Sequence, residues 1–141
     1  SRAGFSRLIG LDVYVNGSFL NAYEGDGIII STPTGSTGYN LSAGGPIVDP
    51  MARLMIITPV CPHSLTSKSI VLPSDAKVSI EIAKKRKTQD TEAIVSFDGG
   101  NDFELAAGDV LDICVSQRTT QLVKASDVNF YEILRNKLGG K

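Results

Sequence analysis

The chain has 141 residues, with 14 basic and 15 acidic side chains and a formal net charge of -1. This length suits one domain with its own core, and the balanced charge gives no general reason to expect nucleic acid or a membrane surface as a partner. No apolar run approaches the roughly 20 residues of a membrane span, and no signal peptide is visible at the N-terminus.

The two cysteines, Cys61 and Cys114, are far apart in the sequence, and each lies among apolar residues. We predict two buried free thiols, with a disulfide or a metal pair as the alternative. Free thiols fit a reducing, cytoplasmic location. Because the chain starts at Ser1 inside a segment that has the pattern of ordered structure, we expect it to be part of a longer protein.

Short strand patterns fill the first half of the chain. They cover residues 11–15, 18–23, 28–30, 54–58 and 69–72. Asn16-Gly17 lies between the first two, and this dipeptide favours a type I′ hairpin turn because both residues adopt positive φ. The isoleucines at 28–30 predict a strand that is buried on both faces. Pro59 and Pro73 are expected to end the strands that precede them.

The second half alternates apolar and polar residues with a period of two. Strand patterns lie at residues 78–82, 95–98, 111–115 and 121–124, and turn signals lie at 73–75, 98–101 and 107–109. Many short strands at regular spacing predict a mainly β fold, a multi-stranded β-sandwich-like domain. The basic run at residues 84–87 has no interleaved aromatic residues, so we interpret it as a solvated hairpin tip that does not bind nucleic acid.

Two segments have helical patterns. Residues 36–43 suit one short helix, with Ser36 or Thr37 as its N-cap. Residues 126–141 suit a C-terminal helix, with Ser126 or Asp127 as its N-cap and Gly139 at its end. The apolar residues on one face of the second helix are Phe130, Ile133, Leu134 and Leu138.

The segment GDGIIISTPTGSTGYN, residues 25–40, joins a predicted strand to a polar loop and a helix start. Unpaired N–H groups at a helix start favour an anionic or polar ligand. The loop adds hydroxyls, glycines and a ring from Thr34, Gly35, Ser36, Thr37, Gly38 and Tyr39. No lysine follows the glycines, which excludes the Walker phosphate loop. The loop residues alone leave two readings open, a capped turn without a ligand and a ligand site.

Three further polar residues are candidates for a site. Asp26 and Asp98 each precede a glycine at a strand boundary, where aspartate forms turns or accepts hydrogen bonds from ribose or amide groups. His63 is the only histidine, which makes a histidine-based metal site improbable, and a structural hydrogen bond is its alternative role. No catalytic Ser-His-Asp or Cys-His arrangement follows from the spacing.

Several stretches of the chain, taken together, resemble one family. They are GDGIIISTPTGSTGYNLSAGGPIVDP (25–50), MIITPVCPHSL (55–65), IVLPSD (70–75), VSFDGG (95–100) and FYEILRNKLG (130–139). Their sequences and order closely resemble those of NAD kinases, the enzymes that phosphorylate NAD to NADP. The resemblance covers essentially the whole chain.

One part of the family pattern is missing. Members begin with an α/β domain that carries a G-G-D-G-T motif, followed by an Asn-Glu pair, and neither occurs in this sequence. The resemblance therefore implies that residues 1–141 are the C-terminal, β-rich NAD-binding domain only. Residues 126–141 would pack on the absent N-terminal domain, and without it we expect the helix to pack on another copy or to be disordered. The catalytic base belongs to the missing motif, so no catalytic residue is expected in this chain.

The resemblance also implies a set of NAD-binding residues. Thr34, Thr37, Gly38 and Tyr39 match positions around the adenosine, Asp26 and Ser42 match positions near the other end of the dinucleotide, and Asp98 and Gly99 match a loop from another strand. Pro62 and His63 match a contact from a neighbouring subunit, which implies a homo-oligomer. Gly38 stands where alanine is common, a change expected to loosen the helix start.

The implied reaction transfers a phosphoryl group from ATP, or from polyphosphate in some members, to the 2′-hydroxyl of the adenosine ribose of NAD. It requires a divalent metal such as Mg²⁺ and a base. We expect this domain to bind NAD but neither metal nor ATP, and to be inactive alone. The alternatives are a non-catalytic dinucleotide-binding or oligomerisation module, and a lipid kinase with the same two-domain plan. A polar site of nucleoside size suits NAD better than an acyl chain.

Overall fold

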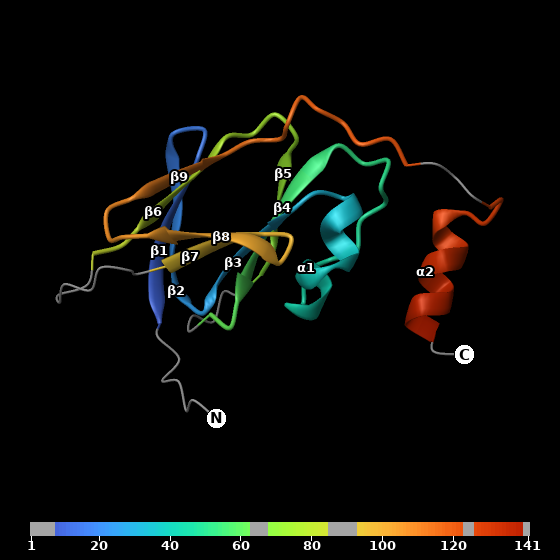
Figure 1. Cartoon of the computed structure of the whole chain (residues 1–141), viewed down its shortest axis with the longest axis horizontal. Coiled ribbons are helices and arrows are strands. Elements are labelled where there is room, and N and C mark those ends of the chain that lie inside the picture. The colour runs from blue at the N-terminus through green and yellow to red at the C-terminus, as the bar shows by residue number, and fades with distance from the viewer. Residues whose placement is uncertain (1–7, 63–67, 85–92, 123–125, 140–141) are drawn as a thin grey trace.

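A computed structural model describes residues 8–62, 68–84, 93–122 and 126–139. These residues form three antiparallel sheets with strand orders β2-β1-β6-β9, β3-β4-β5 and β7-β8 (Figure 1). The strands are β1 (Ile9–Val15), β2 (Ser18–Gly25), β3 (Gly27–Ser31), β4 (Leu54–Val60), β5 (Ile70–Pro73), β6 (Val78–Ile82), β7 (Ala93–Phe97), β8 (Gly100–Leu105) and β9 (Val110–Ile113). The helices are the 3₁₀ helix η1 (Thr34–Thr37), α1 (Tyr39–Ser42) and α2 (Phe130–Gly139).

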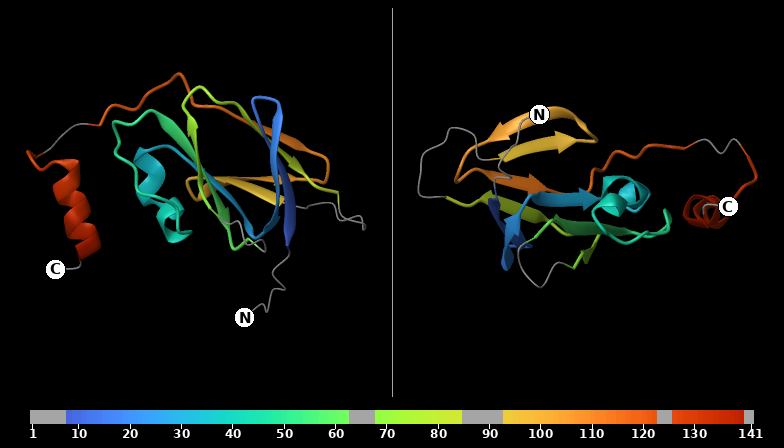
Figure 2. Two further views of the ribbon diagram at one scale, coloured as in Figure 1. Left: turned by 180° about the vertical axis from the view of Figure 1, so that it is seen from behind. Right: turned by 90° about the horizontal axis from the view of Figure 1, so that it is seen from below.

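The two larger sheets share one hydrophobic core. Its buried residues come from β1, β2, β6 and β4, and they are Leu11, Val13, Tyr23, Val78, Ile80, Ile82, Met55 and Ile57. The β7–β8 hairpin closes one side, where Ala93 and Leu105 pack against this core (Figure 2). The predicted mainly β, sandwich-like fold is confirmed. None of the described helices is long and apolar enough to cross a membrane.

The predicted hairpin turn between β1 and β2 is confirmed. Asn16 and Gly17 have φ of 50° and 82°, as a type I′ turn requires. The Asn16 backbone N–H donates to Lys77 O at 2.8 Å. The Lys77 N–H donates to Asn16 Oδ1 at 2.9 Å, so the same asparagine joins the turn to the start of β6.

Two strand predictions differ from the structure. The isoleucines of β3 are only half-buried, because β3 is an edge strand with β4 as its neighbour. Pro59 does not end β4, which continues to Val60. Pairing between β4 and β5 stops at Ile57, so Pro59 lies where β4 has only β3 beside it. A proline, which has no backbone N–H to donate, is tolerated there because only one neighbouring strand pairs with this part of β4.

The cysteine prediction is right about free thiols and wrong about burial. Cys61 and Cys114 are both free and exposed. Cys114 directly follows β9, an edge strand whose inward residues are Leu111 and Ile113, so alternation directs Cys114 outward. Cys61 follows β4 in a left-handed conformation, with φ of 45°.

Substituting Cys61 with asparagine is expected to stabilise the protein. A non-glycine residue in the left-handed region costs about 1 kcal/mol or more, and asparagine tolerates that region better than cysteine. We expect a higher denaturant midpoint for Cys61→Asn and an unchanged midpoint for Cys114→Asn, because Cys114 is not in the left-handed region. A lower midpoint for Cys61→Asn would show that the thiol makes a stabilising contact.

The predicted helix caps are wrong at both sites. Neither η1 nor α1 has a side-chain cap hydrogen bond, so neither Ser36 nor Thr37 caps a helix. At the C-terminal helix α2, the N-cap is Asn129, whose Oδ1 accepts from the Glu132 N–H at 2.9 Å. Ser126 and Asp127 precede the cap, because an asparagine next to the first helical residue satisfies the same backbone donors.

The helix α2 lies beside the β-domain and is not part of its core (Figures 1 and 2). None of its described residues is buried. The Tyr131 hydroxyl donates a hydrogen bond to the Asp49 carboxylate. This contact lowers the pKa of Asp49 and raises the pKa of Tyr131. The apolar face of α2 is not buried in the β-core of its own chain, and packing of this helix on another copy or on an N-terminal domain stays a prediction.

Some predictions fall outside the described residues. They concern His63, the basic residues 85–87 and residues 123–124 of the last expected strand. The other two residues of that strand, Gln121 and Leu122, are exposed and are not in a strand.

Candidate functional site

The polar loop begins where β3 ends and is built from two very short helices. The Gly35 N–H donates to Thr32 Oγ1 at 3.2 Å, which closes the turn after the strand. The N–H groups of Ser36 and Gly38 donate to Pro33 O and Gly35 O, both at 3.1 Å. These three N–H groups are thus already paired within the loop. The expectation that they would be free for an anion is wrong at these positions.

The loop instead presents side chains. Thr34 is exposed and Thr37 is half-buried, so a hydroxyl is available at each end of η1. Tyr39 opens α1, and its side chain is 69% exposed. Ser42 lies three residues later, on the same face of the helix as Tyr39. At Gly38, φ is -86°, and a Cβ there would lie 3.4 Å from Gly35 O, so alanine also fits.

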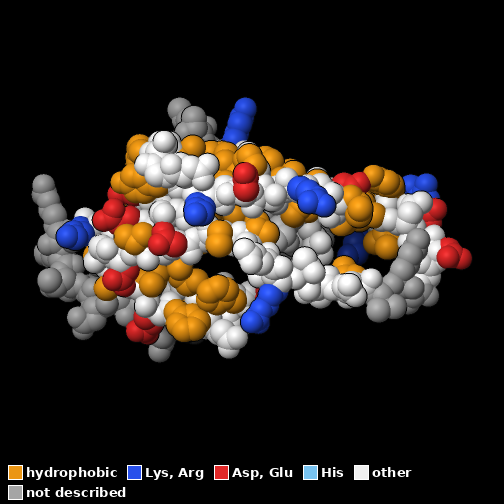
Figure 3. Space-filling model, turned by 90° about the horizontal axis from the view of Figure 1, so that it is seen from above, with side chains coloured by type: hydrophobic (Ala, Val, Ile, Leu, Met, Phe, Trp, Pro, Cys, Tyr) orange, Lys and Arg blue, Asp and Glu red, His pale blue; other side chains and the backbone are white. Residues whose placement is uncertain are grey.

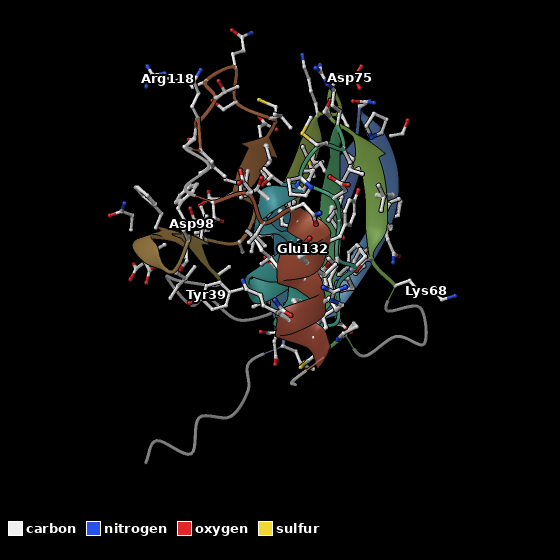
Figure 4. All side chains as sticks on the ribbon, turned by 90° about the vertical axis from the view of Figure 1, so that its right-hand side faces the viewer. Tyr39, Lys68, Asp75, Asp98, Arg118 and Glu132 are labelled. Atoms are coloured by element: carbon white, nitrogen blue, oxygen red, sulfur yellow. The ribbon has the colours of Figure 1, made fainter. Side chains whose placement is uncertain are left out.

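The loop meets the turn between β7 and β8. A Cβ placed on Gly99 would lie 3.0 Å from the Tyr39 hydroxyl and 3.6 Å from its ring. Asp98 and Gly99 have φ of 49° and 75°, so they form the turn that the sequence predicts. Figure 4 shows Tyr39 and Asp98 on the same side of the molecule. The structure therefore brings together two predicted site segments that are distant in the sequence. Gly99 comes 60 residues after Tyr39.

Exposed aromatic rings flank this turn. Phe97 and Phe103 pack edge to face, with ring centroids 5.9 Å apart, and each ring is more than half exposed. Apolar side chains also occupy parts of the surface seen in Figure 3. In the sequence, Phe97 stands only within a strand pattern, and Phe103 carries no signal that marks it as a site residue. Exposed rings beside the Asp98-Gly99 turn are suited to contact with a flat or apolar ligand group.

Asp26 lies at the opposite end of β3 from the loop. Its backbone N–H donates to Val60 O at 3.0 Å. A Cβ on the preceding Gly25 would lie 2.9 Å from Cys61 O and 3.0 Å from the Pro62 Cα. Asp26 is therefore beside Pro62, and the strand separates it from Tyr39. The five residues of β3 span about 16 Å along the strand, at about 3.3 Å per residue.

A buried polar cluster under the loop is absent from the predicted set. It consists of Ser36, Asn40 and Thr58, each at most 2% exposed. The Ser36 Oγ accepts from the Val48 N–H at 3.0 Å, and Thr58 Oγ1 donates to Asn40 Oδ1 at 2.6 Å. The available signal is Asn40 four residues after Ser36, which places both on one helical face. Sequence alone does not show that this face is turned inward.

The described residues contain no group of three or more His, Cys, Asp or Glu side chains that could hold a metal ion. A hollow of about 380 Å³ lies elsewhere, between the β1–β2 turn, β6 and β9. Its lining includes Lys77, Asp112 and Cys114 and none of the predicted NAD-binding residues.

The fold and the loop define a β-domain that presents a polar, tyrosine-bearing loop against an Asp-Gly turn. Residues 2–125 match the family described as the ATP-NAD kinase C-terminal domain. The chain belongs to this family.

Two curated relatives named NAD kinase are each 51% identical to the chain. The one from Lachnoclostridium phytofermentans aligns with all of the chain and 50% of its own length. The one from Agathobacter rectalis aligns with 98% of the chain and 49% of its own length. The chain therefore spans about half the length of the curated relatives that it matches.

Solved structures of NAD(H) kinases have the same fold. A yeast NADH kinase complexed with NADH is 36% identical, with a TM-score of 0.68, over 79% of this chain and 32% of that protein. An NAD kinase from Archaeoglobus fulgidus in complex with ATP is 29% identical, with a TM-score of 0.70, over 82% of this chain and 42% of that protein. The predicted family is confirmed.

Proposed function

We propose that this chain is the NAD-binding half of an NAD kinase. The whole enzyme would transfer a phosphoryl group from ATP or polyphosphate to the 2′-hydroxyl of the adenosine ribose of NAD, which forms NADP. The observation that carries this proposal is the contact of Tyr39 with Gly99 in a chain of this family. That contact brings a ring, hydroxyls and a carboxylate to one surface.

The described side chains suit the binding of an adenosine. The exposed Tyr39 ring is suited to stacking on the adenine, which stabilises binding by about 1–3 kcal/mol per base in single-stranded nucleic-acid complexes. The Thr34 and Thr37 hydroxyls can donate or accept hydrogen bonds at the sugar and base edges. The Asp98 carboxylate can accept from ribose hydroxyls. Gly38, Gly99 and Ser42 complete this group of proposed contacts.

The far end of β3 would bind the other half of the dinucleotide. Asp26 lies there beside Pro62, and the strand β3 lies between Asp26 and the start of the loop. An extended dinucleotide suits two separated groups of contacts better than a mononucleotide does. Pro62 and His63 are proposed to contact the ligand of a neighbouring subunit, which would make the enzyme a homo-oligomer.

Phosphoryl transfer needs groups beyond this surface. Catalysis of this class consists mostly of positioning and charge stabilisation, with a divalent metal on the donor phosphates. The described residues contain no candidate metal cluster, so we assign no step to a metal held by this chain. We propose that a GGDGT-bearing N-terminal domain supplies the base and the ATP loop. The described residues of this chain would bind NAD and orient its 2′-hydroxyl.

The C-terminal helix is proposed to pack on that N-terminal domain. No described residue of α2 is buried, and its apolar residues Ile133 and Leu138 are exposed. Covering this face would stabilise the helix, since a helix of 10 residues is marginal on its own. A cytoplasmic location is part of the same proposal, because it matches the two free thiols.

NADP formation is the direct test of this proposal. We expect the intact protein to form NADP from NAD with ATP or polyphosphate, and residues 1–141 alone to form none. Adding the N-terminal domain to residues 1–141 should restore activity. Robust NADP formation by residues 1–141 alone would contradict the proposal that the N-terminal domain supplies the base and the ATP loop. NAD binding without any NADP formation by the intact protein would favour a non-catalytic dinucleotide-binding module.

A further inference from the structure

The side chain of Asn40 is buried directly beneath the proposed site. It is 1% exposed, whereas the neighbouring Tyr39 is 69% exposed. Asn40 Nδ2 donates to Ser36 O at 3.0 Å and to Pro46 O at 2.9 Å. Asn40 Oδ1 accepts from Thr58 Oγ1 at 2.6 Å. Both amide hydrogens and the amide oxygen are thus used inside the protein.

These hydrogen bonds join segments that have little stability of their own. The helices η1 and α1 have four residues each and no side-chain caps. Helices this short do not persist without tertiary contacts. The Asn40 amide joins the first helix at Ser36, the following loop at Pro46 and the central strand β4 at Thr58. The Asn40 side chain therefore ties the start of α1, where Tyr39 lies, to the following loop and to the sheet.

Asn40 has no room to move. A Cβ on Gly45 would lie 2.2 Å from Asn40 Oδ1, and the Gly45 N–H donates to Asn40 O at 2.8 Å. The Thr58 hydroxyl gives its proton to Asn40, so the Ser69 hydroxyl, 2.8 Å away, must donate to Thr58. The amide is thus held from two sides. The backbone position of Tyr39, the preceding residue, is therefore also fixed.

We propose that Asn40 is a positioning residue for the dinucleotide site. This inference rests on the proposed function. Asn40 holds the backbone of Tyr39 so that the ring lies against Gly99, where a ligand base can stack on it. Asn40 does not contact the ligand, because its side chain is enclosed by Ser36, Pro46 and Thr58. Its effect on NAD affinity is therefore transmitted through Tyr39.

A double-mutant cycle in the intact protein tests this proposal. The variants are Asn40→Ala, Tyr39→Ala and the pair together, and the measurement is the dissociation constant for NAD by calorimetry. We expect Asn40→Ala to raise this constant about tenfold, through the loss of buried hydrogen bonds that fix Tyr39. In the Tyr39→Ala background, the same change should alter it by about twofold or less, because the two residues act as one unit.

Two further variants separate positioning from loss of stability. Val78→Ala removes core packing on β6, which pairs with β1 and β9 and not with β3 or β4, and should leave NAD affinity unchanged while it lowers stability. Thr58→Val keeps the shape of a β-branched side chain and removes only the hydroxyl that donates to Asn40. It should raise the dissociation constant by about threefold, and it tests the proposal even if Asn40→Ala does not fold.

The outcomes distinguish this inference from the proposed function. Unchanged NAD affinity in both Asn40→Ala and Thr58→Val, with a wild type that binds NAD, overturns the inference alone. Additive effects of Asn40→Ala and Tyr39→Ala also overturn it, because Asn40 would then act independently of Tyr39. A wild-type protein that does not bind NAD overturns the proposed function, and the inference falls with it.

Discussion

Replacing Gly45 with alanine is expected to destabilise the protein by about 3 kcal/mol. The new Cβ would lie 2.2 Å from Asn40 Oδ1, and the other two atoms of the amide are within 2.6 Å of it. The amide must therefore move, and it loses its hydrogen bonds to Ser36, Pro46 and Thr58. Chemical denaturation of the intact protein, monitored by the unfolding of this domain, measures the loss of stability.

The control and the rescue for this prediction come from the same chain. Gly27→Ala, on β3, adds a methyl group with no atom within 4 Å and should cost nothing. Asn40→Ala opens space beside residue 45, so the Gly45→Ala and Asn40→Ala pair should be less destabilised than the sum of the single variants. Full additivity of the two changes would contradict the steric explanation.

Replacing Tyr39 with alanine is expected to weaken NAD binding by about ten- to a hundredfold, the range that corresponds to the loss of one stacked base. The ring is exposed and lies against Gly99, so its removal takes away a stacking surface without opening the core. Affinity for NAD, measured by calorimetry on the intact protein, should fall, whereas affinity for ATP should not.

Two variants make the Tyr39 prediction specific. Tyr39→Phe keeps the ring and removes the hydroxyl, so it should retain most of the affinity. Phe19→Ala removes another exposed ring, on β2 and in edge-to-face contact with Tyr14, and should leave NAD affinity unchanged. Equal NAD affinity of Tyr39→Ala and the wild type would exclude stacking on this ring.

Local sequence patterns predicted much of the β structure. The Asn16-Gly17 turn formed as expected, because the backbone preference of these residues is intrinsic. The period-two pattern of residues 78–82 placed Val78, Ile80 and Ile82 in the core. The same local reasoning failed at Pro59 and at the isoleucines of β3, because their environment depends on which strands are neighbours.

The candidate site was also predicted only in part from the sequence. The family motif identified the loop and the Asp98-Gly99 turn as separate segments, and the contact of Tyr39 with Gly99 became visible only in the fold. Ser36 or Thr37 is predicted to cap the short helix, but Ser36 is fully buried and accepts a hydrogen bond from the Val48 N–H. A serine in a polar loop, directly after Gly35, suits both roles by local preference. The packing of the loop on β4 selects between them.

The sequence by itself determined the family, the mainly β class, the hairpin turns and the polar loop, because each depends on neighbouring residues or on a contiguous motif. Only the tertiary structure decided that Asn40 is enclosed, that Gly45 must lack a side chain, that Cys61 and Cys114 are exposed, and that α2 lies outside the core. These features arise from contacts between segments distant in the chain. Burial and hydrogen-bond partners are properties of those contacts, and local preferences of the residues do not specify them.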